Sequence, residues 1–160
     1  MLGANMHTQH ESTASPVALL TGFVPFDINQ LDGPALDWAV AQAAGIPVKI
    51  LPAVAKDVVR AHWVTPHGFG SFRPSSDWSD AGPLLREFQV ALYPEAHDGR
   101  EGTEMSERWV ANVYYEGGLQ YTTEPCRNEL IALCRAIVVT KFGETVNVPP
   151  ELGLEDKLAA

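Results

Sequence analysis

The sequence predicts an α+β domain in which a small, mainly antiparallel sheet is covered by two or three helices in a sandwich-like arrangement. The segments after Asp32 and after Thr123 both carry apolar residues at helical spacing. Residues 90–93 and 108–115 are rich in β-favouring side chains, and a polar segment joins them as in a hairpin. The chain contains no internal repeat or low-complexity tract that would indicate a larger architecture.

Length and composition limit the function classes. The 160 residues, 46% of them apolar, suffice for one sizeable core and predict a single domain over residues 16–150, with a flexible leader over 1–15 and a loose tail over 151–160. Twenty acidic and eleven basic residues give a net charge of −9, which disfavours binding to nucleic acid polymers. With no run long enough to span a membrane and no signal peptide, the expected location is the cytoplasm.

The first convincing helix begins after Asp32, a candidate N-cap, with Pro34 in its first turn and Gly45 at its end. Before it, residues 17–24 are apolar and are interpreted either as a short strand or as an apolar tail. After it, residues 48–54 and 58–64 read as short strands, whereas 68–70 indicates a turn. Residues 94–107 are acidic and glycine-rich, which predicts a long exposed loop.

The last helix is predicted to start near Thr122 and Thr123, followed by an early Pro125, and to end at Gly143. Its apolar stripe consists of Leu130, Leu133, Cys134, Ile137 and Val138. If Cys126 and Cys134 share this helix, they lie roughly 12 Å apart along it and are too distant for a disulfide. Two such cysteines favour a reducing compartment.

Residues 72–85 contain the first candidate site. Ser75, Ser76 and Asp77 can each accept hydrogen bonds from backbone N–H groups as a helix begins, and Trp78 follows them. Such a turn presents hydroxyls and amides to a polar or anionic ligand. The alternative is an ordinary capped helix with Trp78 packed on the core.

A second group of candidates lies near the last helix. Arg127 in a first turn would oppose the helix dipole, so it either pairs with a neighbouring glutamate or binds a phosphate together with Thr123 and the free amides. Arg135 lies off the apolar stripe and faces solvent, a subunit contact or the ligand; we expect Arg135→Ala to abolish ligand binding. Tyr114 either stacks on a base or belongs to the core.

No catalytic group, metal site or cofactor motif is convincing. Cys126 near a helix start could have a lowered thiol pKa, but no histidine is placed beside it by sequence. His62 and His67 lack the additional ligands that a zinc site needs. We therefore expect a non-enzymatic protein without a cofactor or metal.

Three blocks in order resemble the NinX-like bacteriophage proteins. They are residues 31–41, then 74–78 with 82–85, then 130–136 with 141–146 and 148–149. The chain departs from that pattern in its longer leader, in an apparent insertion over 52–72 and in Glu129, where a proline is expected. Within the shared blocks the resemblance carries over Asp37, Trp38, Ser75, Asp77, Trp78 and Arg135.

The NinX pattern is in turn distantly similar to the phage ABA-sandwich proteins, which include the Thoeris anti-defence sponges. That resemblance implies a cytoplasmic homo-oligomer of the infected host that sequesters a small nucleotide immune signal of the cyclic ADP-ribose or cyclic oligonucleotide type. The alternative is a phage accessory module that binds a host protein, with the acidic 94–107 loop meeting a basic partner.

Overall fold

A computed structural model of the chain describes residues 22–51, 60–65, 68–95 and 106–152. Residues 1–21 with the proposed leader, residues 52–59 and 66–67 of the proposed insertion, the middle of the acidic loop and residues 153–160 lie outside this part. The division into leader, domain and tail therefore stays a prediction.

The described residues form an α+β fold, as predicted. The helices are α2 (Gly33–Ala44), α3 (Trp78–Glu87) and α4 (Glu129–Phe142), with 3-10 turns η1 (Ile28–Gln30), η2 (Glu116–Gly118) and η3 (Pro150–Leu152). The strands are β1 (Val24–Asp27), β2 (Val48–Leu51), β3 (Arg60–Thr65), β4 (Gly68–Ser71), β5 (Ala91–Pro94), β6 (Trp109–Tyr115), β7 (Leu119–Thr122) and β8 (Thr145–Val148). They pair antiparallel in three small sheets rather than one, in the orders β1-β8, β2-β3-β4 and β5-β6-β7.

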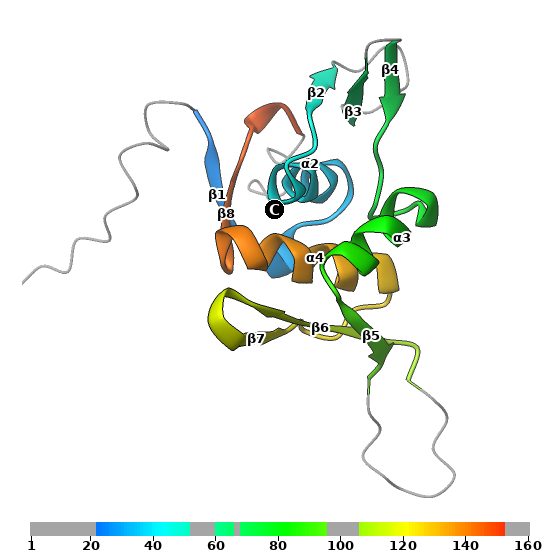
Figure 1. Ribbon diagram of the computed structural model, residues 1–160. Helices are drawn as coiled ribbons and strands as arrows, with labels where there is room; N and C mark the ends of the chain where they lie inside the picture. The colour runs from blue at the N-terminus through cyan, green and yellow to red at the C-terminus, as the bar shows by residue number, and fades with distance from the viewer. Residues whose placement is uncertain (1–21, 52–59, 66–67, 96–105, 153–160) are drawn as a thin grey trace, which may run out of the picture.

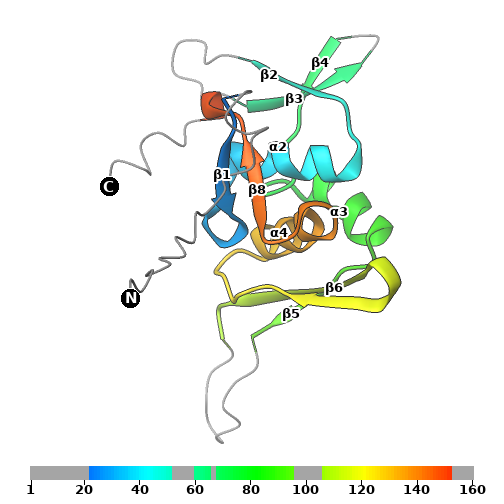
Figure 2. The same cartoon turned by 90° about the vertical axis from the view of Figure 1, so that its left-hand side faces the viewer.

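Helix α4 lies at the centre of the molecule. In Figures 1 and 2 it runs between α2 on one side and the β5-β6-β7 sheet on the other. This explains why α4 is apolar over most of its circumference: Leu133, Cys134, Ile137 and Val138 are all fully buried. A helix that packs on two sides cannot show a single narrow apolar stripe.

The predicted hairpin is confirmed, with its first strand one residue later than expected. Strand β5 pairs with β6 in the register Ala91 to Asn112. Along β6, Ala111 and Val113 are fully buried in the core, whereas Tyr114 between Val113 and Tyr115 is 65% exposed. Because side chains alternate along a strand, Tyr114 lies on the face of the sheet that points away from α4.

The limits of α2 follow the sequence signals. Asp32 occupies the N-cap position, Pro34 lies in the first turn, and Gly45 ends the helix with a left-handed φ of 67°. Of the apolar residues 17–24, interpreted as a strand or a tail, 17–21 lie outside the described residues, and Val24 begins the strand β1, which pairs with β8. Residues 68–70, predicted as a turn, instead belong to β4, which pairs with β3.

The predicted start of the last helix is wrong. Thr122 ends strand β7, and Cys126 is still extended, because its N–H and C=O both bond to the backbone of Trp109 at 3.0 and 2.7 Å. The helix begins only at Glu129, where the side chain of Asn128 accepts hydrogen bonds from the N–H groups of Leu130 and Ile131. Strand pairing over 119–126 therefore outweighs the local helix-start signal. Gly143 ends the helix, as predicted.

Asn128→Ala should lower the free energy of unfolding by about 1 kcal/mol, because two amides at the start of the central helix lose their acceptor. Urea denaturation of Asn128→Ala and Asn128→Asp measures this. Aspartate keeps the accepting oxygen, so it should retain most of the stability. An equal loss in both variants would show that capping is not what Asn128 contributes.

Candidate functional site

The turn before α3 is organised by its own backbone and carboxylates. The carbonyl of Arg73 accepts from the N–H groups of Ser76 and Asp77 at 3.0 and 2.8 Å, and the Arg73 N–H donates to Oδ2 of Asp80 at 2.8 Å. Asp77 caps α3 by accepting from the N–H and hydroxyl of Ser79 at 2.9 and 2.6 Å. The turn is thus held independently of any ligand.

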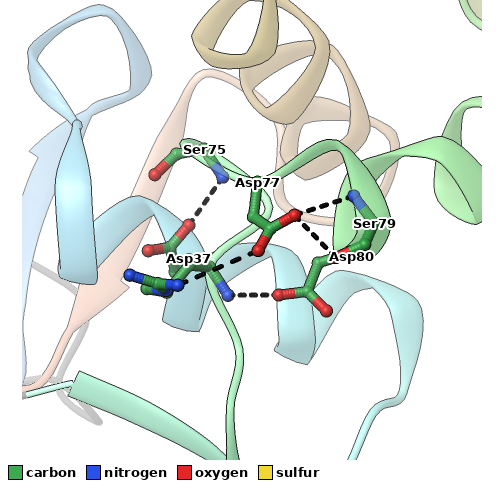
Figure 3. A network of polar contacts seen from close by, with 6 residues as sticks. Asp37, Ser75, Asp77, Ser79 and Asp80 are labelled. Carbon is green, nitrogen blue, oxygen red and sulfur yellow. Dashed lines mark hydrogen bonds and ion pairs between the residues drawn. The ribbon is translucent and has the colours of Figure 1, made fainter.

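A buried carboxylate on α2 meets this turn. The Asp37 side chain, 4% exposed, accepts a hydrogen bond of 2.8 Å from the N–H of Ser75 (Figure 3). The contact joins positions 38 residues apart in the chain. It therefore fixes the Ser75 turn against the N-terminal half of α2.

A cavity of about 320 Å³ opens at this junction, and we call it the Asp37 cavity. It lies among the start of α2, the turn before α3 and the start of α4. Its lining residues are Gly33, Pro34, Asp37, Arg73, Ser75, Ser76, Asn128 and Ile131.

Burial raises the pKa of Asp37 to about 6, in spite of the hydrogen bonds from Ser75 that lower it. The nearby negative charge of Asp80 raises this pKa and the positive charge of Arg73 lowers it. A buried carboxyl with a perturbed pKa that lines a cavity is a candidate functional group. At neutral pH it is mostly ionised and accepts hydrogen bonds only.

Arg73 supplies the positive charge of the cavity. Its side chain is 43% exposed, and its Nη2 lies 3.8 Å from Oδ2 of Asp77. At this distance the two groups form an ion pair but no hydrogen bond. Its Nε is buried, and no described residue accepts a hydrogen bond from it. The guanidinium therefore keeps donors for a further acceptor.

The candidates in the Ser75 turn divide into two pairs. Ser75 and Ser76 line the Asp37 cavity. Asp77 and Trp78 do not: the carboxylate of Asp77 caps α3, and Trp78, 48% exposed, lies at the first position of that helix. The alternative of a capped helix thus describes Asp77 correctly, whereas Trp78 is not packed in the core.

The structure does not bring Thr123, Arg127 or Tyr114 to the cavity. Thr123 is buried, and its hydroxyl accepts from the N–H of Ala111 at 2.9 Å. Arg127 is exposed and precedes the helix rather than lying in its first turn. Tyr114 lies on the outer face of the β5-β6-β7 sheet, on the far side of α4 from α2.

The guanidinium of Arg135 is bonded to the backbone of the chain itself. Its Nε and Nη2 both donate to the carbonyl oxygen of Leu31, at 3.1 and 3.0 Å. The residue is half-buried and ties α4 to the segment that leads into α2. It does not line the Asp37 cavity, so an effect of Arg135 on ligand binding would be exerted through the position of α2.

Two residues of the cavity, Arg73 and Asn128, were not predicted from the sequence, and Asp37 was carried over from the NinX resemblance without being assigned to the ligand. A signal existed for Asp37, because a carboxylate inside an otherwise apolar helix and beside its apolar stripe needs a partner. No such signal existed for Arg73 or Asn128, since both positions depend on how α3 and α4 pack.

A second cavity of about 430 Å³ lies on another side of α2. Phe23 and Trp38, whose ring centroids are 6.0 Å apart, form part of its wall, with Lys49 and Glu151 beside them. None of its lining residues is a buried ionisable group. It therefore offers less for recognising a polar ligand than the Asp37 cavity.

The cysteines are free. Burial raises the pKa of the Cys126 thiol, contrary to the lowering considered from sequence, because Cys126 lies outside the helix and is half-buried. The described ranges hold no group of three His, Cys, Asp or Glu side chains placed to bind a metal. In the same ranges no helix has the length and apolar character that crossing a bilayer requires.

The comparison with protein families identifies the family of the chain. The family model of bacteriophage P22 NinX matches residues 27–141, well over half of the chain. The chain belongs to the NinX family. It is thus a bacteriophage protein, and the resemblance found in the sequence is confirmed. Every residue that lines the Asp37 cavity lies within the matched range, so the cavity belongs to the NinX part of the chain. No curated protein matches the chain.

Proposed function

We propose that this NinX-family protein binds a small nucleotide signal in the Asp37 cavity and sequesters it without altering it, acting in the cytoplasm of the infected host. The observation that carries the proposal is the cavity itself. It combines the partly exposed guanidinium of Arg73 with a buried carboxylate and two serines. A nucleotide offers matching groups, namely phosphate oxygens and sugar hydroxyls.

The net charge of −9 does not oppose this proposal. It repels phosphate polymers that would spread over the surface, but one phosphate needs only a local donor. Arg73 provides that donor near the opening, because its side chain is partly exposed. Because Arg73 is the one cationic residue in the described lining, we expect each cavity to bind a single phosphate.

Binding without catalysis fits the chemistry of the described residues. The raised pKa of Cys126 leaves little of the nucleophilic thiolate at neutral pH. Asp37 is held by the N–H of Ser75, which orients the carboxylate but does not activate a nucleophile. Among the described residues, the site therefore has groups that can recognise a ligand and no group that is activated as a nucleophile.

The size of the cavity supports a homo-oligomer. Small-molecule sites span roughly 300–1,000 Å³, so a cavity of about 320 Å³ accommodates about one mononucleotide. A cyclic ADP-ribose or a cyclic oligonucleotide extends beyond that volume. We infer that a second copy of the chain covers the remainder of such a ligand.

Native mass spectrometry after incubation with a panel of cyclic and ADP-ribose-type nucleotides tests this function. Intact ligand released on denaturation is the expected result, and a chemically altered ligand would instead show an enzyme. Absence of uptake at micromolar concentrations would overturn nucleotide sequestration. Binding to a host protein would then be the function to test.

Arg73→Gln should weaken capture of the bound nucleotide by about tenfold or more, because a hydrogen bond to a charged group contributes about 1.5–3 kcal/mol. The backbone N–H of residue 73, which donates a hydrogen bond to Asp80, remains in this variant, so the turn should persist. Arg86→Gln is the matched control, since Arg86 is an exposed residue of α3 that does not line the cavity. Equal affinity in both variants would remove Arg73 from the site.

A further inference from the structure

Two groups of opposite charge lie at different depths in the Asp37 cavity. The residue Asp37 is 4% exposed, whereas the side chain of Arg73 is 43% exposed. Solvent thus reaches the guanidinium far more than the carboxylate, and we infer that Asp37 forms the inner end of the cavity and Arg73 its opening. A ligand that uses both must carry different chemistry at its two ends.

The inner end rejects an anion and accepts hydrogen-bond donors. An ionised carboxylate only accepts hydrogen bonds, and the charges of Asp37 and Asp80 would both repel a phosphate placed there. Ser75 beside Asp37 adds a hydroxyl that both donates and accepts. Neutral hydroxyls of a sugar fit these partners.

The opening has the opposite preference. The side chain of Arg73 is partly exposed, and its ion pair with Asp77 spans 3.8 Å. A phosphate oxygen can form the short charge-assisted hydrogen bonds that this ion pair lacks. Ser76, which is exposed and lines the same cavity, offers a further hydroxyl.

We propose that the Asp37 cavity selects a ribonucleotide over a deoxyribonucleotide, with the vicinal ribose hydroxyls donating to Asp37 and the phosphate bound by Arg73 at the opening. This inference rests on the proposed function and specifies both the class of ligand and its orientation. A vicinal diol can donate two hydrogen bonds to one carboxylate. A 2′-deoxyribose loses one of these donors and leaves the buried acceptor less satisfied.

Isothermal titration calorimetry with AMP and 2′-deoxy-AMP tests this selectivity on the full chain. One mononucleotide matches the volume of the cavity, so AMP is a suitable probe. AMP is expected to bind about tenfold or more tightly than 2′-deoxy-AMP. Equal affinities would overturn the assignment of the diol to Asp37.

The variant Asp37→Asn tests whether Asp37 is the group that binds the vicinal diol. It should reduce the preference for AMP towards unity, because AMP loses the charged acceptor of two hydroxyls whereas 2′-deoxy-AMP loses the acceptor of one and is weakened less. Asp27→Asn is the matched control, because this exposed residue of β1 undergoes the same change of charge without lining the cavity. Full retention of the preference in Asp37→Asn would contradict the proposal, and circular dichroism of each variant verifies its fold.

The two proposals fail in different ways. If nucleotides of the panel are captured but AMP and 2′-deoxy-AMP bind equally or not at all, sequestration stands and the ribose assignment is wrong. If no nucleotide is captured, sequestration and the ribose assignment are both wrong.

Discussion

Ile137→Ala should lower the free energy of unfolding by about 2–5 kcal/mol. Ile137 is fully buried in α4, which packs against α2 on one side and the β5-β6-β7 sheet on the other. A cavity at this position lies in the core, where the layers packed on both sides of α4 restrict its collapse. Urea denaturation followed by circular dichroism measures the loss.

Ile131→Ala is the matched control, because it makes the same chemical change in the same helix. Ile131 is only half-buried and lines the Asp37 cavity, so solvent already reaches one side of it. Its replacement should cost clearly less than that of Ile137. Similar losses at both positions would show that α4 is not the centre of the core.

Asp37→Asn should change how stability depends on pH. The pKa of Asp37 is raised from 3.8 to about 6 in the folded chain, so the stability associated with its protonated form is present below the unfolded pKa and is lost as the pH rises through about 6. Between about pH 3.5 and about pH 7.5 this difference is worth about 2–3 kcal/mol. Asparagine does not titrate, so the variant should gain that amount relative to the wild type over this interval.

Urea denaturation of both proteins at several pH values measures this change. Asp77→Asn provides a control of opposite sign, since hydrogen bonds from Ser79 lower the pKa of Asp77. Its contribution to stability is present above the unfolded pKa and lost as the pH falls, so this variant should lose stability relative to the wild type at higher pH. A constant difference between Asp37→Asn and the wild type at every pH would contradict the burial of an ionisable Asp37.

The Asp37 prediction bears directly on function. At neutral pH an ionised buried carboxylate reduces the stability of the fold, and asparagine of nearly the same shape would avoid that cost. Such a group fits a role in binding better than a role in packing. Groups that violate a rule of stability are expected where a protein performs its function.

Much of the fold could be predicted from the sequence, because its signals are local. Asp32 with Pro34 marks the start of α2, Gly45 marks its end, and alternation along β6 separates Ala111 from Tyr114. The start of α4 could not be predicted, because the bonds between Cys126 and Trp109 join positions 17 residues apart. Residues that favour the start of a helix give no information about a pairing between distant positions.

The site was predictable only in part. Ser75 and Ser76 were found because hydroxyls in a turn before a helix are visible in the sequence, and both line the cavity. Arg135 was expected at the ligand, yet its guanidinium bonds to the carbonyl of Leu31, a partner 104 residues away. Charge and residue type identify a candidate, but its partner depends on the packing of α2 against α4.

A crystal structure of the protein with a captured nucleotide tests the central claim most directly. The predicted result is a nucleotide in the Asp37 cavity, with a phosphate oxygen in hydrogen-bond distance of Arg73 and a ribose hydroxyl in hydrogen-bond distance of Asp37. A nucleotide bound instead in the cavity beside Trp38, or on the outer face of the β5-β6-β7 sheet near Tyr114, would contradict the claim.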